Sequence, residues 1–262
     1  MADFGDLRLQ KRFISLSQSF LDHPGHSIPA ACGDWAGSKT AYRFFDNEKV
    51  TPAKMLEPHL TMLKSRTHSQ SVVLAVQDST YLNLDTYTSM QDLGFVESSN
   101  TWSHKGLVLH SSLAFTTQGE CLGMLCYKIF SRSEKQSTRH EYMNKPIHEK
   151  ESYRWVESLV KNIERCSSDT DIVTIGDRES DIYELFQDAE KFRTFYLVRS
   201  SIDRYVFDEE FPGRKERKLS NVFDSTKRSG YYDLEIPAHK GRVCRTAKGE
   251  IQFFETKLKP PQ

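Results

Sequence analysis

Two aspartates stand where apolar, β-rich runs of the chain give way to polar residues. Asp78 follows the run 72–76, and Asp177 follows the run 171–176. Strand ends hold side chains rigidly, and burial raises the free-energy cost of two unpaired negative charges. Bound Mg²⁺ or Mn²⁺ relieves that cost, because both ions prefer oxygen ligands. The pattern indicates a carboxylate metal site, although a single strand-end Asp more often caps the turn or helix that follows it.

The segments around these acids predict an α/β domain with a mixed sheet. The strand before Asp78 is expected to end at 77–80, and the strand before Asp177 could be its neighbour. The other expected elements are strands at 107–115 and 121–130 joined by a turn at Gln118-Gly119, a helix at 149–165, a helix capped by Ser180 or Asp181, and a strand at 194–198.

The first 66 residues predict a small helical domain. Leu9, Phe13, Leu16 and Phe20 are spaced by 4, 3 and 4 residues, which is the apolar stripe of an amphipathic helix that Pro24-Gly25 would end. A second helix is expected at 38–45, and a third is expected to begin at Thr51-Pro52 with Thr51 as its N-cap.

Beyond residue 200 the pattern weakens into short β-like pieces at 205–207, 231–236 and 251–254, separated by stretches rich in Lys, Arg and Gly. They predict a partial all-β insertion at 201–262. The expected organisation is therefore a helical domain at 1–66, an α/β domain at 67–200 and this β-rich segment.

Composition narrows the class of protein. The net charge of zero argues against a protein that coats DNA by charge alone. The charge is nevertheless uneven: Lys+Arg minus Asp+Glu is 9 − 7 = +2 for 1–66, 13 − 19 = −6 for 67–198 and 14 − 10 = +4 for 199–262. No apolar run approaches the ~18 residues of a membrane span, and the five cysteines show no metal-ligand spacing. We expect reduced thiols and a cytoplasmic, nucleoid-associated protein with no membrane contact.

Six blocks, in this order, resemble one family, the DDE transposases of bacterial insertion sequences, in the insertion-sequence-four group that includes the transposon-five enzyme. The blocks are Gly5-Asp6-Leu7-Arg8-Leu9-Gln10-Lys11-Arg12, Ala41-Tyr42-Arg43-Phe44-Phe45-Asp46-Asn47, Ala75-Val76-Gln77-Asp78-Ser79-Thr80, Leu109-His110-Ser111-Ser112-Leu113-Ala114, Lys150-Glu151-Ser152-Tyr153-Arg154-Trp155 and Gly176-Asp177-Arg178-Glu179-Ser180-Asp181-Ile182-Tyr183.

The resemblance implies a helical domain that grips double-stranded transposon-end DNA and a ribonuclease-H-like catalytic domain interrupted by a β insertion. Residues 67–200 would then be the first part of the catalytic domain, and 201–262 would be part of the insertion. Asp78 and Asp177 match the first two catalytic acids of that family, which bind two metal ions together with a third acid. The third acid is a Glu in the signature Tyr-x2-Arg-x3-Glu-x6-Lys, and no tyrosine of this chain has Arg at +3 and Glu at +7. We therefore expect a chain truncated before that acid, binding Mg²⁺ or Mn²⁺ weakly.

The candidates for DNA contact are mostly basic residues of the helical domain. Lys and Arg would supply phosphate contacts, and a tyrosine could stack or pack beside the backbone, whereas Phe44 and Phe45 are expected in the core. The candidates are Arg8, Lys11, Arg12, Lys39, Tyr42, Arg43 and, after the last strand of the sheet, Arg199.

Three functions fit this pattern. The first is a cut-and-paste transposase, present as an inactive truncated copy or fragment that binds DNA ends. The second is a regulator that occupies transposon ends or an intact transposase and inhibits transposition. The third is a metal-dependent nuclease that is completed by another chain or that works with two acids. The expected protein partners are a second copy of the chain in a homodimer or an intact transposase.

Overall fold

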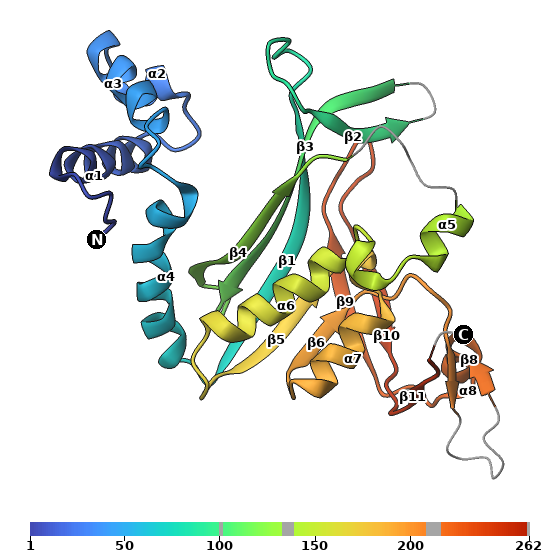
Figure 1. The fold of residues 1–262 in the computed structure, drawn as a ribbon. Coiled ribbons are helices and arrows are strands. Elements are labelled where there is room, and N and C mark those ends of the chain that lie inside the picture. Colours follow the sequence, from blue (N-terminus) through green and yellow to red (C-terminus); the bar gives the residue numbers. More distant parts are fainter. Residues whose placement is uncertain (100–101, 133–138, 208–215, 261–262) are drawn as a thin grey trace. The chain divides into compact units, whose positions relative to one another are not determined.

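The computed structural model describes residues 1–99, 102–132, 139–207 and 216–260 (Figure 1). Contacts divide the chain into two compact units. The first unit comprises Met1–Gly176 and Glu184–Leu197, and the second comprises Asp177–Tyr183 and Val198–Gln262. Within the described ranges, no helix is both long enough and apolar enough to cross a membrane.

Four helices open the first unit, and side-chain caps set where each begins. They are α1 (Leu7–Asp22), α2 (Ile28–Cys32), α3 (Trp35–Phe45) and α4 (Pro52–His68). Thr51 accepts a hydrogen bond from the Lys54 N–H, which confirms the start expected for α4. Asp34 accepts from the Gly37 N–H, so α3 begins three residues before the expected Ser38. Helix α2 was not anticipated, although Ser27 caps it in the same way.

Aromatic side chains hold α1–α3 together. The rings of Phe4 and Phe13 lie 5.6 Å apart, and Phe44 lies 5.6 Å from Phe4 and 6.1 Å from Phe13. Ala41 and Leu16 are buried in the same cluster. Phe44 thus belongs to the core, as expected. Phe45 does not, because 43% of it is exposed; successive helix residues point about 100° apart, so only one of the pair faces inward.

The sheet of the first unit has six strands. They are β1 (Val72–Asn83), β2 (Gly94–Ser99), β3 (Trp102–Phe115), β4 (Cys121–Phe130), β5 (Asp171–Gly176) and β6 (Phe195–Val198). Their order is β2-β3-β1-β5-β6, with β4 also paired to β3. β1 runs antiparallel to β3 and parallel to β5, which makes the sheet mixed. The hairpin β3–β4 is confirmed, while β2 was not anticipated.

The expected end of the first strand at 77–80 is wrong. β1 loses its partner β5 after Val76 but stays paired with β3 as far as Asn83, which lies opposite Gly106. The strand therefore continues past Asp78. The apolar run ended early because only the first half of β1 lies between two other strands, where both faces favour apolar residues.

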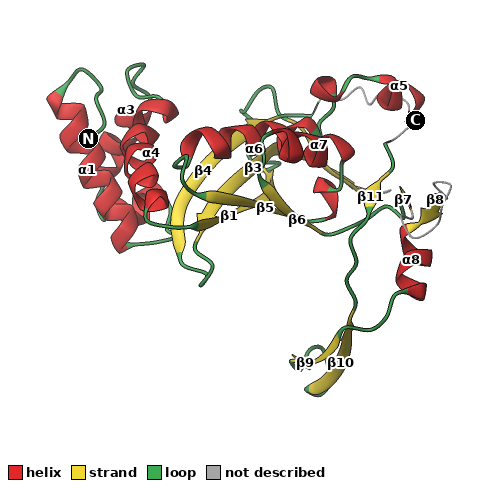
Figure 2. Ribbon diagram, turned by 90° about the horizontal axis from the view of Figure 1, so that it is seen from below, coloured by secondary structure: helices red, strands yellow, loops and turns green. Residues whose placement is uncertain are grey.

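Helices cover the sheet. Figure 2 shows α6 (Tyr153–Arg165) and α7 (Tyr183–Lys191) on the same side of it. Buried side chains of α4, β1, β3, β4 and β5 make one core, to which Leu63, Val73, Ala114 and Leu125 belong. The short elements α5 (Arg139–Asn144), η1 (Ile147–Glu149) and η2 (Arg178–Ser180) complete the connections.

The second unit contains two small sheets. β7 (Tyr205–Phe207) pairs with β8 (Glu216–Lys218) and β11 (Lys257–Leu258), and β9 (Gly230–Ile236) pairs with β10 (Arg245–Ile251). Helix α8 (Leu219–Ser225) lies between β8 and β9 in sequence, so this segment is not purely β. The expected fold class, a helical N-terminal region followed by a mixed α/β sheet and β-rich pieces, is confirmed.

Candidate nucleic-acid interface and carboxylate site

One face of α3 gathers aromatic and basic side chains that the core leaves exposed. Lys39, Tyr42 and Arg43 follow one another at helical spacing, and Trp35 precedes Lys39 by one turn. Trp35 is 79% exposed and Tyr42 is 53% exposed. With Phe45 and Asp46 these residues line a hollow of about 650 Å³. We call Trp35, Lys39, Tyr42, Arg43 and Phe45 the α3 face.

Two members of the α3 face, Trp35 and Phe45, were not expected on the surface of this helix. Trp35 lies outside the helix that the sequence predicted to begin at Ser38. Had Asp34 been recognised as the N-cap, the spacing of four residues from Trp35 to Lys39 would have placed both on one side. Phe45 was assigned to the core together with its neighbour Phe44.

The α3 face has the chemistry of a nucleic-acid surface. Lys39 and Arg43 are exposed cations, which neutralise phosphates, and exposed aromatic rings pack on sugars or stack on bases. Asp46 at the C-cap is the single acid of the hollow. The net charge of these lining residues is therefore +2 − 1 = +1, which favours contact with DNA without strong general attraction.

The three basic candidates on α1 differ in their surroundings. Lys11 is exposed. Arg8 is also exposed, but it forms an ion pair with Asp6 at 3.0 Å. Arg12 is half-buried and donates a hydrogen bond to the backbone carbonyl of Gly37. Arg12 thus ties α1 to the first turn of α3, and its DNA contact stays a prediction, as do those of Arg8 and Lys11.

Arg199 lies apart from these residues in the chain. It is exposed and directly follows Val198, the last residue of β6. It belongs to the second unit, whereas α1 and α3 belong to the first. Its DNA contact also stays a prediction.

Asp78 lies in the middle of β1 with its side chain exposed, opposite Ser111 of β3. Its neighbours Gln77 and Ser79 point to the other side of the sheet, and Gln77 is buried. The Ser79 N–H donates to Asp78 Oδ1 at 2.8 Å. The burial argument for a metal at this acid therefore fails, since the strand is buried but the carboxylate is not.

Asp177 directly follows Gly176, the last residue of β5, and is also exposed. It is the N-cap of η2 and accepts a hydrogen bond from the Glu179 N–H at 2.9 Å. Capping, the common role of a strand-end Asp, is thus present here. In the parallel register Val76 pairs with Ile175, and the two acids come two residues after this pair in their respective segments.

The most deeply buried acid of the block 176–183 is Asp181, which the sequence indicated only as a helix cap. It is 4% exposed and accepts hydrogen bonds from the Ser201 and Ile202 N–H groups at 2.7 and 2.9 Å. Arg204 donates to it at 3.0 and 2.7 Å. Burial alone would raise the pKa of Asp181, but these hydrogen bonds outweigh it and lower the pKa. Asp181 therefore holds the segment after β6 in place.

The two predicted metal ligands suit a hard divalent cation in ligand type. Both carboxylates are exposed, and neither forms an ion pair with the described basic residues. Across the described ranges, no three His, Cys, Asp or Glu side chains are grouped closely enough to hold an ion. Two carboxylates would leave most coordination positions to water, as Mg²⁺ sites commonly do.

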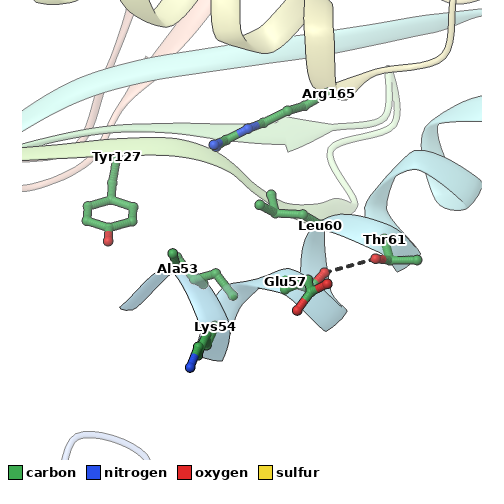
Figure 3. A pocket seen from close by; sticks show the side chains of 8 residues that line it. Ala53, Lys54, Glu57, Leu60, Thr61, Tyr127 and Arg165 are labelled. Carbon is green, nitrogen blue, oxygen red and sulfur yellow. Dashed lines mark hydrogen bonds between the residues drawn. The ribbon is translucent and has the colours of Figure 1, made fainter. Parts of the chain in front are cut away.

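A separate groove of about 590 Å³ lies beside α4 (Figure 3). Lys54, Glu57, Leu60 and Thr61 of α4 line it, with Tyr127 of β4 and Arg165 at the end of α6. None of the predicted site residues lies in this groove. Its mixture of one acid with two basic residues indicates no particular ligand.

Residues 1–50 match a family of transposase DNA-binding domains. The matched segment contains α1, α2 and α3, and hence the whole α3 face. Since it is about a fifth of the chain, it describes this segment and not the chain as a whole.

Similar solved structures include complexes of the Mos1 transposase. The paired-end complex with the left transposon end is 8% identical, with a TM-score of 0.27, over 72% of this chain and 59% of that one. The Mos1 strand transfer complex is 8% identical, with a TM-score of 0.26, over 72% and 58%. This chain thus spans about three fifths of the length of those chains. At such TM-scores the likeness carries no weight for fold or function.

Proposed function

We propose that this chain is a transposase of the cut-and-paste type whose N-terminal helices bind double-stranded DNA at transposon ends. The α3 face carries the proposal. It exposes two cations and three aromatic rings on one side of a helix, inside the segment that matches transposase DNA-binding domains. These exposed side chains are not part of the core, to which the same helix contributes Ala41 and Phe44.

The binding we expect is modest and sensitive to salt. Each neutralised phosphate releases counterions and adds about 0.9 to the slope of log affinity against log salt. The zero net charge of the chain supplies little additional attraction. Specific end recognition would then depend on which side chains of the α3 face reach base edges.

Asp78 and Asp177 are the proposed ligands of Mg²⁺ or Mn²⁺. The proposal is supported by the two sequence blocks that contain these acids, because each block resembles a metal-binding block of the DDE transposases. When bound, such an ion would stabilise negative charge on phosphoryl oxygens. The residues of the chain itself would hold the ion and orient it beside the DNA backbone. With two carboxylates we expect weak binding and no strand cleavage by this chain alone.

Tryptophan fluorescence tests the DNA-binding proposal. Of the three tryptophans, Trp35 is exposed on the α3 face and Trp155 of α6 is buried; the third is Trp102 of β3. Adding a mixed-sequence duplex should quench the fluorescence of the wild type, and Trp35→Phe should remove most of the change while leaving binding detectable by gel shift. Equal quenching in both proteins would place the DNA on another surface.

A regulator that occupies DNA ends without cutting them is the second candidate. It is favoured by the α3 face, because exposed cations and aromatic rings are sufficient to occupy DNA without cutting it. Incubation with supercoiled DNA and Mn²⁺ separates the candidates: a regulator leaves the plasmid intact and inhibits an intact transposase added with it. If the wild type nicks the plasmid and Asp78→Ala does not, the catalytic function is established instead.

A further inference from the structure

A buried network of hydrogen-bonded side chains lies under β1, on the side of the sheet covered by α6. Arg154 of α6 is 5% exposed, and His110 of β3 is fully buried. Arg154 Nε donates to Ser79 Oγ at 3.1 Å, and Ser79 Oγ lies 3.0 Å from His110 Nδ1. His110 Nε2 lies 3.1 Å from Gln77 Oε1. Side chains from three elements thus meet beside Asp78.

The direction of each hydrogen bond in this network follows from Gln77. The Gln77 Oε1 atom can only accept, so His110 donates to it from Nε2. The other ring nitrogen of a neutral His110, Nδ1, then accepts from the Ser79 hydroxyl, whose lone pairs accept from Arg154 Nε. In agreement with this, burial, followed by repulsion from Arg154 and Lys128, lowers the pKa of His110 to about 4.

The positive charge of Arg154 is itself anchored. Arg154 Nη1 donates to the backbone carbonyl of Glu151 at 3.0 Å and lies 3.4 Å from its carboxylate. Arg132 holds the same carboxylate with bonds of 2.8 and 2.7 Å. A buried cation without partners would cost several kcal/mol. These contacts therefore fix the position of the Arg154 side chain.

The backbone of Ser79 connects the hydrogen-bond network to the proposed metal ligand. Ser79 is fixed by its side chain on the α6 side of the sheet, and its N–H donates to Asp78 Oδ1 on the other side. Two blocks of the sequence, those containing His110 and Arg154, supply the other members of the network.

We infer that Ser79, Arg154 and His110 position the Asp78 carboxylate for a divalent cation. This inference rests on the proposed function, because it presumes that Asp78 is a metal ligand. Arg154 and His110 act through Ser79 and do not touch the ion. Groups that hydrogen-bond a metal ligand directly are worth about 10–100-fold in metal affinity. Here that group is the Ser79 N–H, and the Ser79 hydroxyl fixes its position, so the effect expected from loss of the hydroxyl lies at the lower end of this range.

Mn²⁺ binding to the full chain, followed by electron paramagnetic resonance, tests the inference. Ser79→Ala removes the hydroxyl and should weaken Mn²⁺ binding about 10-fold. Ser79→Thr keeps the hydroxyl on a residue that strands favour and should restore binding close to that of the wild type. The matched control is Ser112→Ala on β3, whose buried hydroxyl has no partner in the described part of the chain. It should leave Mn²⁺ affinity unchanged.

Imidazole ¹⁵N spectra give a second readout that needs no metal. The wild type should show His110 as one neutral tautomer protonated on Nε2, and Ser79→Ala should show a mixture of tautomers. Equal Mn²⁺ affinity in wild type and Ser79→Ala, with binding abolished in Asp78→Ala, would overturn the inference and leave the metal site standing. If the wild type shows no Mn²⁺ binding that depends on Asp78, the metal part of the proposed function fails, and the inference fails with it.

Discussion

Replacing Asp181 by alanine should destabilise the second unit more than replacing Asp177 or Glu179, the other acids of the block 176–183. The carboxylate is 2% exposed, and its partner Arg204 is 13% exposed. Removing it leaves the N–H groups of Ser201 and Ile202 without their acceptor, and it takes the carboxylate partner from a nearly buried guanidinium that still donates to the Asp181 carbonyl. Breaking a buried pair by removing one partner costs about 3–5 kcal/mol.

Hydrogen exchange measures this loss where it occurs. A loss of 3 kcal/mol is roughly a 100-fold change in an opening equilibrium, and the amides of Ser201 and Ile202 should exchange faster by about that factor in Asp181→Ala. Asp177→Ala is the matched control four residues earlier. Asp177 is exposed and caps a three-residue helix, so its removal should cost about 1 kcal/mol or less.

The effect should also depend on pH. The pKa of Asp181 is lowered in the folded protein, so its contribution is complete above the ordinary carboxyl pKa and is lost as pH falls through the lowered value. The difference between wild type and Asp181→Ala should therefore shrink in acid. If the Ser201 and Ile202 amides exchange equally in the two variants, the carboxylate does not hold this segment and the reasoning is refuted.

Three smaller predictions concern the first unit. In urea unfolding, Phe44→Ala should cost about 3–5 kcal/mol because it opens the aromatic cluster, whereas Phe45→Ala should stay within about 0.5 kcal/mol; equal costs would contradict the packing. Thr51→Ala should cost about 1 kcal/mol by removing the cap of α4. His104→Ala should raise the pKa of Asp85 in an NMR titration, because the hydrogen bond from His104 lowers that pKa; an unchanged pKa would show that the pair does not form.

Local signals in the sequence predicted the elements that their own neighbours determine. Thr51 followed by Pro52 identifies the start of α4, because capping involves residues a few positions apart. The hairpin of β3 and β4 follows from two β-rich runs around a glycine turn.

The errors come from partners far away in the chain. β1 continues beyond Asp78 because β3, some 30 residues later, stays paired with it. Gln77 is a polar residue in a buried position, where its Oε1 atom lies 3.1 Å from His110 Nε2. No periodicity within 70–80 reveals either partner, so the sequence suggested a strand end at this point.

The candidate sites were predicted unevenly for the same reason. Lys39, Tyr42 and Arg43 lie on one helix, where spacing alone places them together. The role of Arg12 could not be found in this way, since it depends on the carbonyl of Gly37 on another helix. Asp181 was underrated because its partners lie 20–23 residues later, in the segment after β6.

The salt dependence of DNA binding tests the central claim most directly. The affinity of the full chain for a mixed-sequence duplex is titrated at several salt concentrations for the wild type, Lys39→Ala, Arg43→Ala and Lys64→Ala. If the α3 face meets phosphates, each of the first two variants should flatten the slope of log affinity against log salt by about 0.9. Lys64→Ala, an exposed lysine of α4 outside the matched segment, should keep the slope of the wild type. Four parallel lines with equal affinity would contradict the claim that this face binds DNA.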